Sequence, residues 1–564
     1  MKKYFLLFFL ISGLITIGFA NEPRIVRVEQ GEGTLNIAIE SDTTNTGERN
    51  DPDNTWYVLD NGGWYVTVGT IRVVAPLRIV TEDYAPGGSK DQNPSQFYPP
   101  AKPGERAHLV PGLDAAGNPN TIFQFQGDLT LKGIHLWGRV ALGFDQPTAL
   151  QKNIVRAGAP GLALTLIDCF CERDAQSIFR LDKENLVCTF INTTMRNTGQ
   201  IADPSNSRFI DTRGNNGQIM KFENCTFLNG SKHILLSGFG AGGVNEEYLF
   251  NHCSFINNGY SIHFGRIKKT EFKNSLVINN GWHGMQVGFA NADIGDGFAE
   301  MEAILDADSL IVENVPQPQD INIHHNNIWL DREGVDTLLT RIYADSAGTG
   351  HERLSLPYFT PLAEAGAHDN LSEPLQFTAG PPLPIDYCRD FNMAEWCRLT
   401  GGENCGDYFN ALNGEFVVDT TGQNAYDLSY STNAPSYNAS TDGLPLGDLR
   451  WFPDKFSEFV TSIETPERGL PTAYAILRSF PNPFNPSTNI VYTLTAPAKV
   501  NLCIYNILGQ EIKTLINNKT VTAGNHSIQW DSRNSAGQRV PSGIYICKLE
   551  AGKTVRIHKM MLLR

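Results

Sequence analysis

A short pattern of apolar and polar positions recurs between about Phe123 and Trp329. Each copy has an apolar residue, any residue, Asn or a substitute, a small residue and then further apolar residues. The copies start 24, 32, 28 and 22 residues apart, because their first apolar residues are Leu166, Phe190, Phe222, Phe250 and Phe272. A last copy, Ile323–Ile328, follows 51 residues later, about two coils on. A period of about 22 residues with loop insertions predicts stacked coils.

The chemistry of the repeat favours an all-β solenoid. Leucine-rich repeats share the period, but they require a Leu-x-x-Leu-x-Leu pattern with a helical return, which is absent here. In a parallel β-helix, alternate apolar residues point inward and are buried by the coils above and below. The pattern therefore predicts a parallel β-helix.

The Asn position of each copy predicts a corner of the coil. Asn tolerates left-handed backbone and can bond to its own backbone. In a column, each amide can also donate to the next carboxamide oxygen, which stabilises the stack by about 0.5–1.5 kcal/mol per bond. Asp168 and His252 are imperfect members of this column. We interpret its other members as structural residues: Asn192, Asn224 and Asn274.

The chain has ten cysteines, and their spacing separates two groups. Cys169, Cys225 and Cys253 share one register beside the predicted corner. We therefore expect them to be reduced, buried and stacked along the solenoid. A second group is closer together and irregular, and two of its three members could form a disulfide: Cys388, Cys397 and Cys405.

The N-terminal region resembles that of a secreted β-helix. Residues 1–20 have a basic start, an apolar run and small residues at the end, as in a cleaved signal peptide, so we expect the mature chain to begin at Asn21. Gly33–Ile39 then reads as a short amphipathic cap. The first strands are expected at Trp56–Leu59, Trp64–Val68, Ile71–Val73 and Leu77–Val80.

Together with the repeat, this order resembles the pectate-lyase-like superfamily of right-handed parallel β-helices. The resemblance covers about residues 30 to 455 and includes the late segment Asp427–Trp451. It implies a right-handed β-helix over residues 21–465. The sequence contains no motif specific to pectate lyases, polygalacturonases or pectin esterases, so the resemblance implies fold and not activity.

The C-terminal part changes character. A Pro-rich stretch, Pro471–Pro486, is typical of a linker, which we place at 466–480. Short alternating strands separated by Gly and Pro follow over 481–564 and predict a small Ig-like β-sandwich. The ordered motifs through Gly543–Tyr545 to Lys559–Met560 resemble the C-terminal sorting domain of type IX secretion cargo.

That resemblance implies two properties. The partner would be the type IX outer-membrane secretion machinery, and the location would be the outer cell surface of a Gram-negative bacterium. The alternative is an ordinary accessory Ig-like module that contributes only stability or spacing. The two differ in whether residues 471–564 are needed for export.

The composition and charge of the chain argue against some classes of binding partner. The formal net charge of −15 argues against nucleic acid and against an acidic polymer held by bulk charge. No segment after the first twenty residues approaches 18 consecutive apolar residues, so we expect no transmembrane helix in the mature chain. We expect a monomer.

Candidate catalytic residues lie between the predicted corners, where an exposed sheet should run. Basic groups occur there, and a row of them could abstract a proton beside a uronic carboxylate. The alternative is that they are solvated residues of a strand. The 30-residue step from His233 to His263 is near one coil with an insertion, so we select His233, His263 and Arg266 from the full set: Arg213, Lys232, His233, His263, Arg266 and Lys268.

Metal and sugar sites have weaker signals. Asp293 with Asp296 could place oxygens on calcium, as could two other acidic pairs, but none matches a full calcium loop. His324–His325 is discounted as a metal pair because adjacent strand residues face opposite ways. Tryptophans could stack on sugar rings or close coil corners: Trp137, Trp282 and Trp329.

These observations leave three functions open. The first is a surface-displayed β-helix that engages polysaccharide or another surface without assured catalysis. The second is a polysaccharide lyase or hydrolase acting on acidic glycan. The third is a structural or adhesive envelope protein.

Overall fold

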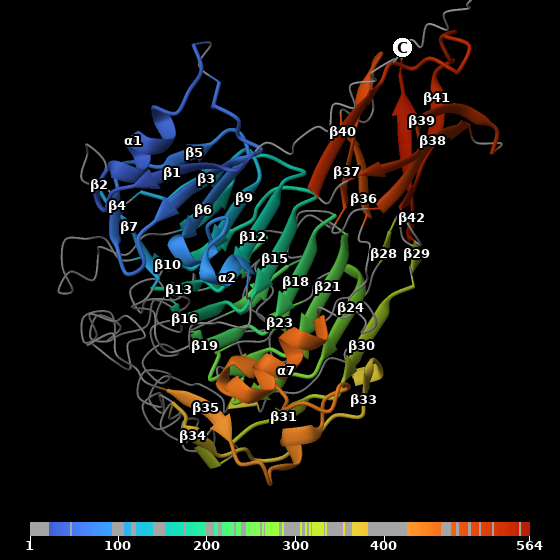
Figure 1. Cartoon of the computed structure of the whole chain (residues 1–564). Coiled ribbons are helices and arrows are strands. Elements are labelled where there is room, and N and C mark those ends of the chain that lie inside the picture. Colours follow the sequence, from blue (N-terminus) through green and yellow to red (C-terminus); the bar gives the residue numbers. More distant parts are fainter. Residues whose placement is uncertain are drawn as a thin grey trace, which may run out of the picture. The chain divides into compact units, whose positions relative to one another are not determined.

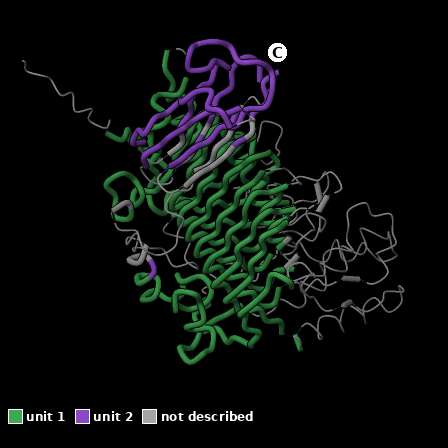
Figure 2. The backbone as a smooth tube through the Cα atoms, turned by 90° about the vertical axis from the view of Figure 1, so that its right-hand side faces the viewer, with its two compact units in different colours: residues 1–458 green, residues 459–564 purple. Residues whose placement is uncertain are grey.

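The computed structural model describes most of the chain. The described residues are 22–45, 48–92, 106–113, 120–138, 153–173, 176–198, 208–212, 217–230, 233–237, 244–259, 262–263, 266–280, 285–286, 305–306, 311–312, 315–316, 318–331, 333–334, 354–355, 364–381, 426–463, 475–480, 484–494, 498–506, 509–521, 524–551 and 554–563. The chain divides into two compact units, Met1–Glu458 and Phe459–Arg564 (Figure 2).

Three long parallel sheets build the first unit. Sheet A has eleven strands: β1 (Arg24–Val28), β3 (Thr55–Leu59), β6 (Leu77–Thr81), β9 (Leu129–Lys132), β12 (Ala163–Ile167), β15 (Val187–Ile191), β18 (Ile219–Glu223), β21 (Asn245–Asn251), β24 (Ile267–Lys273), β30 (Asp320–His324) and β33 (Ala367–His368). Sheet B has ten: β2 (Gly31–Glu32), β4 (Trp64–Thr67), β7 (Ala107–Pro111), β10 (Ile134–Trp137), β13 (Phe170–Glu172), β16 (Thr194–Thr198), β19 (Thr226–Gly230), β22 (Ser254–Ile256), β25 (Leu276–Ile278) and β31 (Asn327–Trp329). Sheet C has eight: β5 (Ile71–Val73), β8 (Phe123–Phe125), β11 (Asn153–Ala157), β14 (Ser177–Arg180), β17 (Arg208–Asp211), β20 (His233–Leu236), β23 (Ile262–His263) and β27 (Leu305–Asp306).

The predicted parallel β-helix is confirmed. Through most of the unit, each coil contributes one strand to sheets A, B and C in turn, and neighbouring strands in a sheet come from successive coils. Figure 1 shows the strands of sheet A side by side in chain order, from blue β3 to yellow-green β30. An all-parallel sheet needs a crossover between its strands, and here the other two sheets supply it.

The core follows the sequence repeat. Leu166, Phe190, Phe222, Phe250 and Phe272 are register partners in sheet A, and all are buried. The rings of Phe190 and Phe222 stack with centroids 4.9 Å apart, and those of Phe222 and Phe250 stack at 4.6 Å. This column lies in the bore of the solenoid, where buried residues of the other two sheets pack against it.

The final step of the repeat was interpreted incorrectly from the sequence. Phe272 pairs directly with Ile323, so β24 and β30 are neighbours and sheet A has no coil between them. The 51 residues therefore form one coil with a long insertion. Two short antiparallel strand pairs involve this insertion. β28 (Ile311–Val312) pairs with β29 (Val315–Pro316) inside it. β26 (Met285–Gln286), also inside it, pairs with β32 (Leu354–Ser355), which follows it in the chain.

The corners between sheets A and B are left-handed. Asn192, Asn224 and Asn274 have φ values of 51°, 49° and 55°, and Asp168 and His252 take the same conformation at 51° and 50°. Asn and Asp adopt this conformation more readily than most residues, so the pattern of the repeat fixes where each coil turns.

A second left-handed column stands where the strands of sheet B end. Its members have φ values of 53° to 55°: Asn197, Asn229, Asn257 and Asn279. Asn229 Nδ2 donates to Asn197 Oδ1 at 3.4 Å, and Asn279 Nδ2 donates to Asn257 Oδ1 at 3.4 Å. Amide-to-amide bonds of the predicted kind thus occur in this column.

Helices and a terminal segment complete the unit. Helix α1 (Thr34–Glu40) begins within the predicted cap, and Asn36 exchanges two hydrogen bonds of 3.0 Å with the backbone of Val68. The remaining elements are η1 (Glu82–Tyr84), α2 (Ser89–Gln92), β34 (Phe377–Ala379), β35 (Asp427–Tyr430), η6 (Pro435–Asn438) and η7 (Leu449–Trp451), and α7 (Pro453–Ile463) contains the boundary between the two units. Of the helices described, none is both long and apolar enough to span a membrane.

The second unit is a two-sheet antiparallel sandwich. One sheet joins β36 (Ala475–Phe480), β37 (Thr488–Leu494) and β40 (Gly524–Trp530). The other joins β39 (Glu511–Val521), β38 (Ala498–Asn506), β41 (Gly543–Ala551) and β42 (Thr554–Leu562). Trp530 is fully buried in a core of its own that includes Phe484 and Tyr545. The predicted Ig-like sandwich is confirmed.

Candidate functional site on the outward face of sheet B

The outward face of sheet B has two halves with different chemistry. Alternate residues of each strand point away from the bore. In the C-terminal half, β19 to β31, these residues are mainly small or apolar. In the N-terminal half, β4 to β16, they include a row of aromatic and ionisable side chains: Trp64, His108, His135, Trp137, Phe170, Glu172 and Arg196.

A terminal strap covers the C-terminal half. We use this name for residues 426–452. Leu428, Tyr430 and Leu446 of the strap form one apolar cluster with outward residues of sheet B such as Leu276 and Ile278. At Gly447, which has φ of 88°, an added Cβ would lie 2.6 Å from Ser254 Oγ, so only glycine allows this close approach. The strap is therefore an integral part of the solenoid.

The strap also forms hydrogen bonds with the corner column. Thr441 N donates to Asn274 Oδ1 at 2.8 Å, and Leu449 N donates to Asn224 Oδ1 at 3.3 Å. The side-chain bonds expected between successive corner amides are thus replaced at these two positions by bonds to the strap. The reason is geometric: the strap runs along the column, so its backbone N–H groups reach the carboxamide oxygens.

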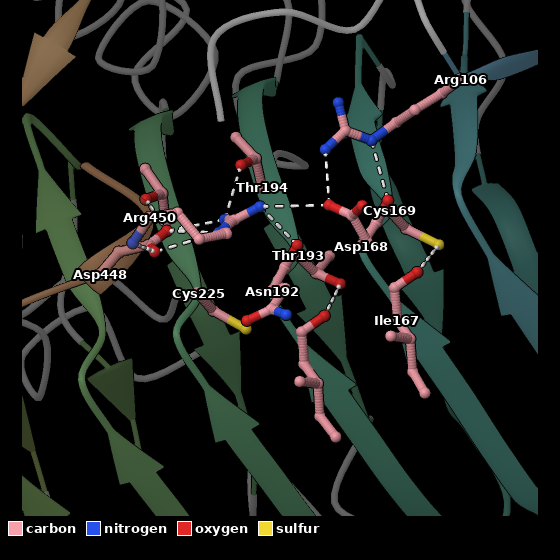
Figure 3. A network of polar contacts seen from close by, with 12 residues as sticks. Arg106, Ile167, Asp168, Cys169, Asn192, Thr193, Thr194, Cys225, Asp448 and Arg450 are labelled. Carbon is pink, nitrogen blue, oxygen red and sulfur yellow. Dashed lines mark hydrogen bonds and ion pairs between the residues drawn. The ribbon is translucent and has the colours of Figure 1, made fainter. Parts of the chain in front are cut away.

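The strap ends in a buried ionic clamp (Figure 3). Arg450 Nη2 donates to Asp448 Oδ2 at 2.7 Å and to Thr194 Oγ1 at 3.0 Å, and Nη1 donates to the Asn192 carbonyl. Arg450 Nη1 also lies 3.9 Å from Asp168 Oδ1. All five residues contribute groups to one buried network between the strap and the middle coils.

Asp168 is the hub of this clamp. Its Oδ1 accepts from Arg106 Nη2 at 2.8 Å, and its Oδ2 accepts from Tyr84 Oη at 2.6 Å and from Lys90 Nζ at 3.5 Å. Burial opposes the ionised carboxyl, but Arg106, Lys90 and Arg450 outweigh it and hold the pKa of Asp168 below its usual range. An Asp at this corner therefore serves as an anchor for three cations.

Trp64 is the exposed feature of the N-terminal half. Its side chain is 47% exposed, although its indole stacks on the buried imidazole of His108 with centroids 4.2 Å apart and planes 17° apart. Strand β2 pairs Gly31 with Tyr65, so none of its residues pairs with Trp64. Trp137 lies beside it, tilted, at 5.8 Å. The result is an aromatic surface supported from below by a fixed ring.

A hydrogen-bonded chain continues from His108 into the face. His108 Nδ1 lies 2.8 Å from His135 Nδ1, and His135 Nε2 lies 3.1 Å from Glu172 Oε1. Arg196 Nε donates to Glu172 Oε2 at 2.9 Å, and Arg173 Nε lies 3.6 Å from the same oxygen. We call the first three of these residues, His108, His135 and Glu172, the relay.

The charges of the relay follow from burial and from the two arginines. Burial opposes the charge of Glu172, but Arg196 and the bond from His135 outweigh it and hold its pKa below the usual range. Burial lowers the pKa of His108 to about 3, and it also lowers the pKa of His135. At neutral pH the relay therefore holds an ionised carboxylate and two neutral imidazoles.

The predicted catalytic residues do not share one exposed strand. His233 and His263 lie on the neighbouring strands β20 and β23 of sheet C, but His263 pairs with Leu236, and His233 is buried. Arg266 immediately precedes β24 in sheet A, so it belongs to a different sheet. An inserted loop and a sheet change separate these residues, which the repeat spacing does not reveal.

The predicted structural residues lie at one register. Cys169, Cys225 and Cys253 are buried free thiols, and each Sγ donates to the carbonyl of the residue two positions earlier at 3.4 Å. Burial raises the pKa of Cys169 to about 12, so its thiol stays protonated. Thr193 and Ser275 make the same bond through hydroxyl groups.

Other sequence-based candidates have mixed positions. Outside the described residues lie Arg213, Lys232, Trp282, Asp293, Asp296, Cys388, Cys397 and Cys405. The argument against His324–His325 is wrong in its geometry, because His325 has φ of 54° and the two Nδ1 atoms lie 2.9 Å apart. Even so, within the described part of the chain no three His, Cys, Asp or Glu side chains are arranged to hold a metal ion.

Sequence reasoning missed the relay and the second Asn column, although both left signals. His-Leu occurs at 108–109 and again at 135–136, one coil apart. Each member of the second column follows a corner residue by five positions, so its steps of 32, 28 and 22 residues match those of the corners. A second register in each repeat therefore indicates the Asn column, and the His-Leu pair indicates the two histidines of the relay but not Glu172.

Comparisons with known proteins cover small parts of the chain. Residues 485–554 match the family described as FlgD Ig-like domain. The comparison with curated proteins finds no match. Two solved structures from Porphyromonas gingivalis match short segments: PorZ, described as an essential bacterial surface component of the type-IX secretion system, and dimeric latent PorU.

These structural matches are limited. PorZ is 19% identical over 16% of this chain and 11% of that chain, with a TM-score of 0.12. PorU is 20% identical over 17% of this chain and 10% of that chain, with a TM-score of 0.15. This chain thus spans about a tenth of either protein, and scores this low carry no argument. The comparisons identify an Ig-like domain within residues 459–564.

Proposed function

We propose that this chain is a cell-surface β-helix protein, exported through its C-terminal Ig-like domain, that binds polysaccharide at Trp64. The observation that carries the binding proposal is the stack of Trp64, half exposed, on His108, which the relay fixes in turn. Sugar rings pack on aromatic faces, and a ring already held in place loses little conformational entropy on binding.

Glycan binding is tested by calorimetric titration of the mature protein. The probes are cellohexaose, chitohexaose and a galacturonate hexamer. Trp64→Ala should weaken binding by about tenfold, because an aromatic stack contributes about 0.5–1.5 kcal/mol beyond buried area. Val74→Ala, which removes another exposed apolar side chain, is the matched control. Equal affinities for Trp64→Ala and the control would reject the site.

The export proposal rests on the sequence of the Ig-like domain. Its motifs from Gly543 to Met560 resemble those of type IX cargo, and the domain has its own core. Deleting residues 471–564 should leave a folded fragment in the periplasm. If the truncated protein reached the cell surface in normal amounts, the accessory-module alternative would hold instead.

A second candidate function is a polysaccharide lyase or hydrolase. The relay favours it, because a carboxylate that orients an imidazole is a common arrangement for proton transfer. Incubating the protein with polygalacturonate and alginate tests it. New reducing ends or ultraviolet-absorbing unsaturated products, lost in His108→Phe, would establish catalysis.

A further inference from the structure

The protonation of the relay can be derived from its buried end. Glu172 is ionised because Arg196 and Arg173 lie against it, and an ionised carboxylate only accepts hydrogen bonds. The ring nitrogen that faces it, His135 Nε2 at 3.1 Å, must therefore carry the proton. This assignment fixes the tautomer of His135.

The same hydrogen-bonding argument assigns the proton position of His108. The burial of His135 keeps its imidazole neutral, so with Nε2 protonated its Nδ1 presents a lone pair. His108 Nδ1, 2.8 Å away, must be the donor. Because His108 is also neutral, its remaining nitrogen, Nε2, carries a lone pair and no proton.

His108 Nε2 is open to a ligand. In the described part of the chain it has no hydrogen-bond partner, and it is not among the fully buried polar atoms that lack one, so solvent reaches it. It lies at the edge of the stack whose outer ring is the exposed Trp64. A glycan unit on the indole would place the next unit of an extended chain near this edge.

We infer that Nε2 of His108 accepts a hydrogen bond from a hydroxyl of the bound glycan, and that Glu172, through His135, holds it in that acceptor state. The inference rests on the glycan binding proposed above. It also names the ligand class. A hydroxyl pairs with this nitrogen, whereas a uronate carboxylate would bring a second acceptor to it, so the site selects neutral sugars over uronic acids at this position.

The inference predicts an unusual dependence on pH. The groups that face His108 are Arg106 before β7, His135 on β10 and Glu172 on β13, and burial with the neighbouring His135 lowers the pKa of His108 to about 3. A free histidine would gain a proton and stop accepting near pH 6.5. Here the acceptor should persist, and affinity should be constant from about pH 8 to about pH 5.

The experiment is a calorimetric titration of the full mature protein with the three hexamers at several pH values. Neutral hexamers should bind at least about tenfold more tightly than the galacturonate hexamer. His108→Phe keeps an aromatic ring under Trp64 but removes the nitrogen, and should weaken neutral binding about fivefold to tenfold. His135→Phe removes the acceptor for His108 Nδ1–H, so the tautomer of His108 is no longer fixed and neutral binding should weaken by about twofold to fivefold.

The outcomes separate this inference from the proposed function. No binding of any hexamer by the wild-type protein would overturn the proposed function, and this inference with it. Binding that is lost in Trp64→Ala but unchanged in His108→Phe would overturn only the inference. So would a wild-type affinity that already falls near pH 6.5, a measurement that needs no variant to fold.

Discussion

The two halves of the outward face of sheet B have the same register and coil geometry, but they differ in the chemistry of their side chains and in what covers them. The half from β19 to β31 carries apolar residues such as Leu276 and Ile278 and is covered by the strap. The half from β4 to β16 carries the relay, two arginines and the exposed Trp64. In a solenoid the inward residues must fill the bore, so only the outward residues can vary with what covers or binds the face of the sheet.

The boundary between the halves is the ionic clamp. Asp448 accepts from Thr226 on β19 at 2.7 Å, while Arg450 donates to Thr194 on β16 at 3.0 Å. The strap therefore ends where the polar row begins. The strap thus covers the C-terminal half, and the proposed glycan site lies in the N-terminal half.

Breaking the clamp should give the largest effect. Arg450→Ala leaves Asp448 and Asp168 buried without this cation, and should lower the free energy of unfolding by about 3–5 kcal/mol. Urea denaturation measures the change. Lys455→Ala, which removes an exposed pair with Glu458, is the control and should leave the free energy of unfolding almost unchanged. Similar costs for both variants would show that the clamp does not hold the strap.

Acid should destabilise the protein through the relay, which lies in the N-terminal half of the face. The folded-state pKa of His108, about 3, lies below its ordinary value of 6.5, so the unfolded chain takes up the proton first. The contribution of neutral His108 to the free energy of unfolding is complete above pH 6.5 and is lost as the pH falls toward about 3. Between about pH 6.5 and 4.5 this group alone should remove roughly 2–3 kcal/mol.

His108→Phe isolates that term from the buried carboxylates, whose contributions also fail in acid. In this variant the free energy of unfolding should decline less steeply over the same pH window. Parallel pH curves for the wild type and the variant would contradict the assignment of His108 as a buried neutral group.

The corner column should show an intermediate effect. Asn224→Ala places Ala at φ of 49° and removes the acceptor for Leu449 N–H, and should cost about 1–3 kcal/mol without changing glycan affinity. Asn433→Ala, at an exposed position in the strap, is the matched control. An unchanged melting temperature for Asn224→Ala would show that the corner does not depend on its amide.

The coil register was readable from the sequence because the core imposes it. Phe190, Phe222 and Phe250 are register partners as their spacing predicted, and the Asn corners turn where the repeat placed them. The insertion before Ile323 hid a direct neighbour, because spacing alone cannot tell one long coil from two short ones.

The site was less predictable than the fold. His108, His135 and Glu172 lie on three successive coils, 27 and 37 residues apart, and outward positions follow no common pattern. The residues selected from the sequence are not brought together, since Arg266 directly precedes β24 of sheet A whereas His233 and His263 lie on strands of sheet C. The sequence places the late segment Asp427–Trp451 in the β-helix region but does not predict its contacts, because it bonds to coils about 170 to 260 positions earlier without sharing their repeat.

The smallest effect on stability should come with the largest effect on binding. Trp64→Ala removes a half-exposed ring and should cost less than about 1 kcal/mol in urea denaturation, while glycan affinity falls about tenfold. Leu446→Ala, in the covered half, should do the reverse, costing about 2–5 kcal/mol with affinity unchanged. Loss of both properties in either variant would erase the distinction between the halves.

The most direct test of the account is hydroxyl-radical footprinting of the mature protein with and without cellohexaose. The method compares the oxidation of individual tryptophans in the two samples. The account predicts that cellohexaose protects Trp64, at the N-terminal half, and leaves Trp451 of the strap and Trp56 of sheet A unchanged. Protection of Trp451 or Trp56 with Trp64 still fully oxidised would contradict the assignment of the N-terminal half as the glycan-binding surface.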